Sequence, residues 1–380
     1  MSGLGVYLHF PWCRKRCPYC DFAVEVGEVP HELYLEAILR ELDARAPAFA
    51  AAGELVSIYL GGGTPSLWRP DCIARAIAAI RARLGAAGAG AAGAAPREVT
   101  IEANPTDVLP ASLDAWRAAG IDRISIGVQS LEPAELVVLG RDHRFGDGLA
   151  AVERALAHGG FAVSADLILG VPSGSRDTAA SLRRIADLPL DHLSVYELTI
   201  EERTAFGQRA RDGRLVPLDE DALERLYTAA HAALTGAGFE HYEISSYARP
   251  GRRAVHNARY WRGEPYLGLG VGAASLEVFA DGAGARATNP RRAAEYLAAP
   301  GVPAEVVPID PDAMAADRAW LGMRTSDGVP EAALAPARGV AGWLVEAGLA
   351  ERRGGRICPT LRGFLFADRI AARIVQCWGA

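Results

Sequence analysis

A short apolar strand followed by a helical segment recurs along the first two thirds of the chain. The six predicted strands are residues 5–9, 55–60, 99–102, 123–128, 163–169 and 193–196. Helical spacing of apolar residues follows them, for example over 31–45 and 70–84. Repeated β-then-α units predict a parallel sheet with right-handed crossovers, either open and doubly wound or curved into a barrel.

In such sheets, functional groups gather beyond the carboxyl ends of the strands. Three cysteines follow the first strand, glycines follow the second, Glu102 ends the third and Gln129 follows the fourth. Asp166 lies inside the fifth strand, so it takes part only if it points into the barrel. One site built from several loops is therefore expected at this edge.

The three cysteines are Cys13, Cys17 and Cys20, spaced C-x3-C-x2-C. A loop of this length can turn all three sulfurs toward one point. A [4Fe–4S] cluster has four irons and takes thiolate ligands, so three cysteines would leave one iron open for an exogenous ligand. The spacing favours such a cluster.

Other interpretations of the three cysteines are weaker. A zinc site needs a fourth ligand at suitable spacing, and none follows closely; His9 precedes the loop and is more easily a strand residue. A disulfide is disfavoured because three is odd and no secretory context is visible. The remaining cysteines, at 72, 358 and 377, are predicted to be buried or incidental thiols.

The cysteine motif, with Tyr19 before its last cysteine, resembles the radical S-adenosylmethionine superfamily. In that family, the amino and carboxylate groups of the methionine moiety chelate the open iron. Residues 7–13 resemble the branch of oxygen-independent coproporphyrinogen oxidases and their relatives. The resemblance implies an α/β fold, a partial (β/α)6 radical-SAM barrel, with a small C-terminal winged-helix-like α+β domain.

Two features distinguish between members of this branch. The oxidases carry a further cysteine two residues after the third cluster cysteine, where this chain has Phe22, as haem chaperones of the HemW type do. The stretch 256–261 reads H-N-x-x-Y-W, which is the signature of those chaperones and implies haem contact by His256. Taken without the resemblance, this stretch is more often a hydrogen-bonded packing motif.

The resemblance also implies a set of cofactor contacts. The predicted residues for S-adenosylmethionine are Tyr7, Phe22, Gly62 and Glu102, with a second molecule near Gly63, Thr64, Gln129, Arg141 and Asp166. The glycines let backbone approach a ligand closely, and without a following lysine they form no P-loop. Buried hydrogen bonds, or a mutual ion pair of Arg141 and Asp166, are the alternatives. No catalytic residue is assigned.

Composition excludes some partners. The net charge of −6 gives no reason to expect nucleic acid or an anionic membrane, and no stretch approaches the ~20 apolar residues of a membrane span. A cytoplasmic location is expected, with peripheral membrane association through a partner at most.

Two domains are predicted. Residues 1–285 form the barrel with its haem-motif extension, and residues 286–380 form the C-terminal domain. A short basic patch at Arg352, Arg353 and Arg356 is assigned to packing or a lid rather than to DNA.

The resemblance implies a haem chaperone that binds a [4Fe–4S] cluster, S-adenosylmethionine and haem and delivers haem to acceptor proteins, with respiratory proteins among the candidates. The alternative is an oxygen-independent coproporphyrinogen III oxidase, in which a 5′-deoxyadenosyl radical starts the oxidative decarboxylation of propionates. A radical enzyme acting on another tetrapyrrole stays open, as do enzymatic activity itself and a homodimer.

Overall fold

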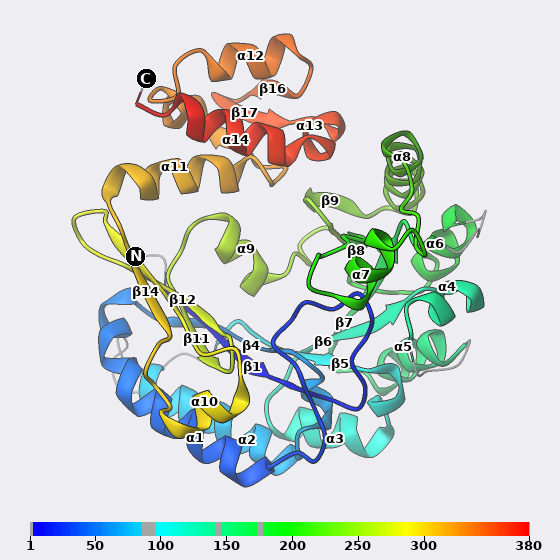
Figure 1. Ribbon diagram of the computed structural model, residues 1–380, viewed down its shortest axis with the longest axis vertical. Coiled ribbons are helices and arrows are strands. Elements are labelled where there is room, and N and C mark those ends of the chain that lie inside the picture. The colour runs from blue at the N-terminus through cyan, green and yellow to red at the C-terminus, as the bar shows by residue number, and fades with distance from the viewer. Residues whose placement is uncertain (1–2, 86–95, 142–145, 173–177, 380) are drawn as a thin grey trace.

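The computed structural model describes residues 3–85, 96–141, 146–172 and 178–379. Its centre is a parallel sheet that curves into a partial barrel (Figure 1). The six predicted strands are neighbours in this sheet, in the order β1 (Leu4–Phe10), β4 (Leu55–Gly62), β5 (Glu98–Ala103), β6 (Arg123–Gln129), β7 (Ala162–Leu169) and β8 (His192–Glu197). The predicted parallel β/α barrel is confirmed.

Further strands extend both edges of this sheet. β11 (Tyr266–Gly270) pairs in parallel with β1, and β12 (Ala274–Val278), β13 (Gly284–Thr288) and β14 (Glu305–Ile309) follow it as antiparallel strands. β10 (Ser246–Ala248) and β9 (Glu240–Glu243) extend the edge at β8. The run 266–273 contains three glycines, a composition typical of a turn, but its first five residues form β11.

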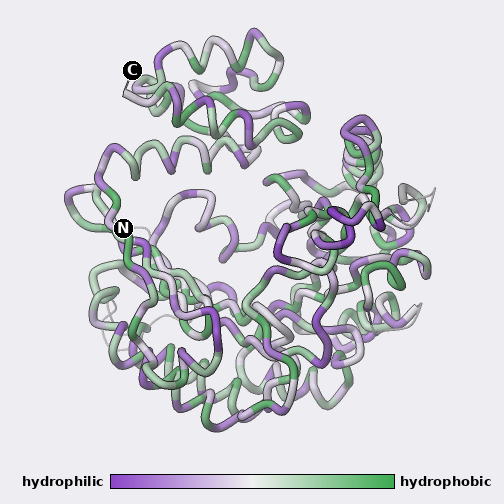
Figure 2. Tube along the Cα trace, viewed as in Figure 1, coloured by the Kyte–Doolittle hydropathy of each residue, from purple (hydrophilic) through white to green (hydrophobic). Residues whose placement is uncertain are grey.

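Helices cover the outer face of the sheet (Figure 1). They are α1 (His31–Arg45), α2 (Pro70–Leu84), α3 (Pro110–Ala118), α4 (Pro133–Val138), α5 (Asp147–His158), α6 (Thr178–Ala186) and α8 (Glu220–Gly236). Three of them begin at a proline, whose fixed φ suits the first helical position. Figure 2 shows that hydrophilic and hydrophobic residues alternate along these helices, as expected for helices that bury one face.

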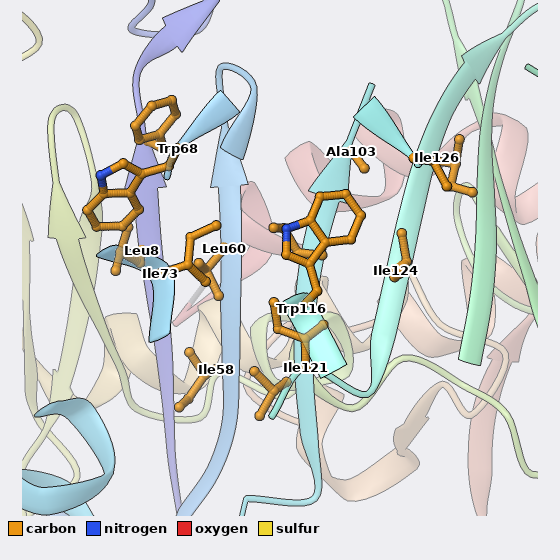
Figure 3. Close-up of a cluster of buried hydrophobic side chains, with 14 of the residues drawn as sticks. Leu8, Ile58, Leu60, Trp68, Ile73, Ala103, Trp116, Ile121, Ile124 and Ile126 are labelled. Atoms are coloured by element: carbon orange, nitrogen blue, oxygen red, sulfur yellow. The ribbon is translucent and has the colours of Figure 1, made fainter. Parts of the chain in front are cut away.

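The main core lies between these helices and the sheet. In Figure 3, Ile58 and Leu60 of β4 point to the same side, and Trp68 and Trp116 pack there beside other apolar side chains. Side chains alternate between the two faces of a strand, so Tyr59 between these residues points to the interior of the barrel. The core therefore determines which residues of each strand face the site.

The C-terminal residues form a smaller unit with a core of its own. Its elements are α11 (Pro311–Gly322), β15 (Val329–Pro330), η4 (Glu331–Leu334), α12 (Val340–Glu346), β16 (Ala350–Arg353), β17 (Arg356–Pro359), α13 (Leu361–Leu365) and α14 (Ala367–Cys377). β17 lies between β15 and β16. The order of these elements matches the predicted winged-helix-like fold: a helix, a strand and two helical segments precede a hairpin. The predicted boundary after residue 285 falls inside β13, which pairs with β14 in the large sheet.

The three arginines of the basic patch on β16 and β17 all form contacts within the chain. Arg352 forms an ion pair with Glu331 at 2.9 Å, Arg353 donates to the Ser326 carbonyl and Arg356 donates to the Asp327 carbonyl. These contacts favour the packing role. None of the helices in the described ranges is long and apolar enough to cross a membrane.

A buried carboxylate attaches α1 to β11 and the segment beyond it. Glu41 accepts hydrogen bonds from the Gly270 backbone at 2.7 Å, the Asn289 amide at 2.6 Å and the Tyr296 hydroxyl at 2.7 Å. Burial raises the pKa of this carboxyl group. Such a group stabilises the fold only while all its partners are in place.

Replacing Glu41 with Ala should lower the free energy of unfolding by about 3–5 kcal/mol, because three buried donors lose their acceptor. Chemical denaturation measures the change. Glu36→Ala is the matched control, since Glu36 is an exposed residue on the same helix and should change stability by less than about 0.5 kcal/mol. Equal changes in the two variants would contradict the assigned role of Glu41.

Candidate cofactor site

One cavity of about 330 Å³ opens at the carboxyl ends of the barrel strands. Its walls are the loop after β1 and the ends of β4, β5, β6, β7 and β8. The predicted site residues that line it are Cys13, Cys17, Cys20, Phe22, Gly62, Gly63, Thr64, Glu102, Gln129, Arg141 and Asp166. Tyr7 and His256 lie outside the lining. The topology therefore brings most of the predicted residues into one site.

The cysteine loop is attached to the barrel at several points. Its short strands β2 (Trp12–Cys13) and β3 (Glu25–Val26) pair with each other, and the Pro18 carbonyl accepts from the Phe206 backbone at 2.9 Å. In Figure 1 the dark-blue loop crosses in front of β5 to β7 toward α7 (Ala205–Arg211). This attachment holds all three thiols in the wall of the same cavity.

The cysteine thiols are partly buried and form no disulfide. Burial raises the pKa of Cys13 to about 11 although the Thr64 hydroxyl lies 3.4 Å from its sulfur, and burial also raises the pKa of Cys20. A bound metal replaces these protons, since coordinated thiols are deprotonated. Three sulfur ligands on one wall fit a [4Fe–4S] cluster with one iron left open.

Glu102 lies at the end of β5 and is held by its neighbours on β4. Its carboxylate accepts from the Tyr59 hydroxyl at 2.7 Å and from the Gly62 backbone at 3.0 Å. The pKa of Glu102 is raised to about 7, mainly by burial; the hydrogen bond from Tyr59 opposes this rise and the nearby Asp166 adds to it. The carboxyl group can therefore change its charge near neutral pH.

The end of β6 has an unusual backbone. Gln129 has a φ of 65°, which side-chain-bearing residues rarely adopt and which is often found at binding sites. Arg141 donates to the Gly127 carbonyl at 3.2 Å and lies 3.6 Å from the Cys17 sulfur. A cation beside a cluster ligand would stabilise its thiolate.

Asp166 lines the cavity, which is the condition for it to take part in the predicted site. Both of its oxygens accept from the Ser125 hydroxyl, at 2.9 and 3.0 Å. Burial raises its pKa. Asp166 thus forms part of the floor of the site, together with the strand-end carboxylate of Glu102.

Tyr7 supports the site from behind its lining. Its hydroxyl lies 3.0 Å from His9 Nδ1, while His9 Nε2 faces the Ala23 carbonyl at 2.9 Å. The carbonyl requires a proton on Nε2, so Nδ1 accepts from Tyr7. A Cβ on Gly62, which has a φ of 110°, would run into the His9 ring. His9 is therefore a supporting residue that limits this position to glycine.

His256 lies on α9 (Val255–Trp261), buried to 1% exposure. Its Nδ1 lies 2.9 Å from the Ser57 hydroxyl and its Nε2 lies 2.8 Å from the Tyr260 hydroxyl. Its ring stacks on Tyr59 with centroids 5.1 Å apart, and burial lowers its pKa to about 3. In this structure His256 packs against the ring of Tyr59, and the Tyr59 hydroxyl donates the hydrogen bond to Glu102.

Sequence reasoning missed the supporting residues Tyr59 and Ser125. The alternation of side chains within a strand could have indicated them, because alternate residues point to the same face. Ser57, Tyr59 and Gly61 share the inner face of β4 in this way. Lys15 and Arg16 also line the cavity, and their position between two cysteines of the loop gives no sequence signal of this.

The chain matches known proteins over nearly its whole length. The Radical SAM superfamily model matches residues 7–186. The haem chaperone HemW of Escherichia coli is 39% identical over 297 residues, which cover 77% of this chain and 75% of that protein. HemW of Mycobacterium tuberculosis is 35% identical over 378 residues, which cover 98% and 94%.

Among solved structures, coproporphyrinogen III oxidase HemN from Escherichia coli, described as a radical SAM enzyme, superimposes with a TM-score of 0.78. The match covers 98% of this chain and 90% of that chain at 23% sequence identity, and it shows the fold alone. The cavity with its three cysteines lies within or next to the matched superfamily region. This chain belongs to the HemW family of the radical SAM superfamily.

Proposed function

We propose that this protein is a haem chaperone that binds a [4Fe–4S] cluster, S-adenosylmethionine and haem, and delivers haem to haem-dependent acceptor proteins. Its relatives of the HemW family carry that name. The observation that carries the proposal is that the three thiols of the cysteine loop and the strand-end polar groups line one cavity, with Phe22 rather than a fourth cysteine two residues after Cys20.

The residues of the cavity have distinct tasks. Cys13, Cys17 and Cys20 would hold the cluster, which supplies one iron without a protein ligand. Glu102 offers a carboxylate to the amino group of the methionine moiety, and Gly62 lets backbone approach it closely. Gln129, Arg141 and Asp166 offer polar groups for a second cofactor molecule.

The test is a haem titration of the anaerobically reconstituted protein, followed by its Soret band, with a parallel coproporphyrinogen decarboxylation assay. We expect one haem per chain and no decarboxylation. Decarboxylation with consumption of S-adenosylmethionine would contradict the proposal and favour the oxidase. Transfer of the bound haem to an apo-haemoprotein would support the second part of the proposal, the delivery of haem to acceptor proteins.

Haem contact by His256 stays a prediction. The hydrogen bonds of the His256 ring determine what such a contact would require. Ligation of the iron would require Nε2 to exchange the Tyr260 hydroxyl for the metal. The same titration on His256→Ala tests this role. Loss of haem binding would support ligation, whereas retained haem with weaker S-adenosylmethionine binding would support a positioning role through Tyr59.

We propose a cytoplasmic location, and acceptor proteins that include respiratory haemoproteins. The homodimer is also a proposal, which size-exclusion chromatography with light scattering would check on the cluster-loaded protein.

A further inference from the structure

Apart from Arg141, which lies beside the end of β6, the charged residues that line the cavity are separated by sign. Its acidic groups Glu102, Asp166 and Glu197 belong to strands of the barrel, whereas three consecutive basic residues, Arg14 to Arg16, lie on the cluster loop. All three basic residues are exposed. The floor of the cavity is therefore acidic and its rim on the cluster-loop side is basic.

Among the residues that the structure describes, two of these rim cations have no acidic partner. Arg14 forms an ion pair with Asp107 at 2.6 Å. In the part of the chain that the structure describes, no carboxylate lies within 4 Å of the Lys15 or Arg16 side-chain nitrogens. These two side chains are available for an anionic ligand at the cavity mouth.

Apolar side chains line the same cavity as the two cations. Phe22 lines the cavity and is 62% exposed, and Val24 lines it as well. An exposed phenylalanine presents a flat apolar face on which a planar ring system can stack. The adjacent Asp21 is held by Arg203 at 3.0 Å and by Arg291 at 3.8 Å, so it does not cancel the charge of the rim.

We propose that this rim is the haem-binding site, with the two propionates at Lys15 and Arg16 and the macrocycle against Phe22. The inference rests on the proposed haem-chaperone function and names its site. Haem is planar, apolar on its faces and carries two carboxylates at one edge, which matches two consecutive cations and an exposed aromatic ring in the lining of one cavity. A haem at the cavity mouth is open to an acceptor protein, whereas His256 is buried.

The experiment compares haem with its dimethyl ester, which lacks the propionate charges, on the cluster-loaded protein. Wild type should bind haem about 3- to 30-fold more tightly than the ester, since each exposed ion pair contributes modestly. The variant with Lys15→Gln and Arg16→Gln should lose this preference and its salt dependence, while its affinity for the ester stays unchanged. Phe22→Ala should weaken both ligands equally.

Arg183→Gln with Arg184→Gln is the matched control, because these adjacent arginines on α6 are exposed and lie outside the cavity lining. It should bind both ligands as wild type does. Cluster content and S-adenosylmethionine affinity are measured in every variant, and an equal loss of cofactor affinity in the Lys15 and Arg16 variant would overturn the proposal.

The outcomes separate this site from the proposed function. If wild type binds no haem, the chaperone function fails. If wild type binds haem and the Lys15 and Arg16 variant keeps the full preference over the ester, the function stands and this site is wrong. Loss of haem binding in His256→Ala with no effect of the rim substitutions would place haem at His256 instead.

Discussion

Cys17→Ser is expected to abolish cluster binding, with iron and acid-labile sulfide falling to near background after anaerobic reconstitution. The loop offers three thiols to the cavity, and a [4Fe–4S] cluster bound by three protein ligands loses a third of its attachment when one is replaced. A serine hydroxyl does not ionise readily enough to substitute. Iron and sulfide analysis, with the visible absorption of the cluster, measures the loss.

The matched control is Cys377→Ser, because Cys377 is also a partly exposed free thiol but lies at the end of α14. Its variant should bind iron and sulfide as wild type does. Zinc analysis of the same samples separates the cluster from the alternative zinc site. Retention of a full cluster by Cys17→Ser would mean that another residue completes the ligand set.

The β/α repeat could be predicted because its signals are local. α1 and α2 have the predicted bounds, His31–Arg45 and Pro70–Leu84, since apolar spacing and the proline at the start of α2 determine them. The six parallel strands followed from alternation with helices, and the clustering of site residues followed from the common direction of these strands. Neither step needs knowledge of distant contacts.

The added strands depend on contacts that a sequence pattern does not contain. β11 includes Gly268 and Gly270, which local propensity assigns to a turn. At Gly268 a Cβ would run into the Ala274 carbonyl, so the strand needs glycine for a close approach. Partners far along the chain decide its structure, since β1 pairs with it across more than 250 residues.

The role of His256 shows the same limit within the site. The motif indicates an important histidine, but Ser57, which lies 199 positions away, occupies its Nδ1. The backbone of α9 is itself held by Glu98, which accepts from the His256 amide at 2.9 Å. The motif identifies a residue near the site, and only the tertiary structure shows that both its nitrogens are engaged.

Glu102→Gln is expected to weaken S-adenosylmethionine binding by about 10- to 100-fold at pH 8, because a hydrogen bond to a charged carboxylate is lost. Gln keeps the size of the side chain, but its amide group has one accepting oxygen, so it can keep only one of the two hydrogen bonds that Tyr59 and Gly62 donate to Glu102. Equilibrium binding to the cluster-loaded protein measures the ratio of wild-type to variant affinity. Glu36→Gln, at the exposed position on α1, serves as the control.

The effect should depend on pH with a definite sign. The pKa of Glu102 is raised to about 7, so the carboxyl group is mostly neutral at pH 6 and mostly ionised at pH 8. The affinity ratio should therefore fall by about 5- to 10-fold from pH 8 to pH 6, and using the ratio removes the titration of the cofactor's own amino group. Asp166→Asn should move this transition to lower pH, because the Asp166 charge raises the pKa of Glu102. A ratio that is constant from pH 6 to pH 8 would contradict the assignment of Glu102 as the charged acceptor of the cofactor.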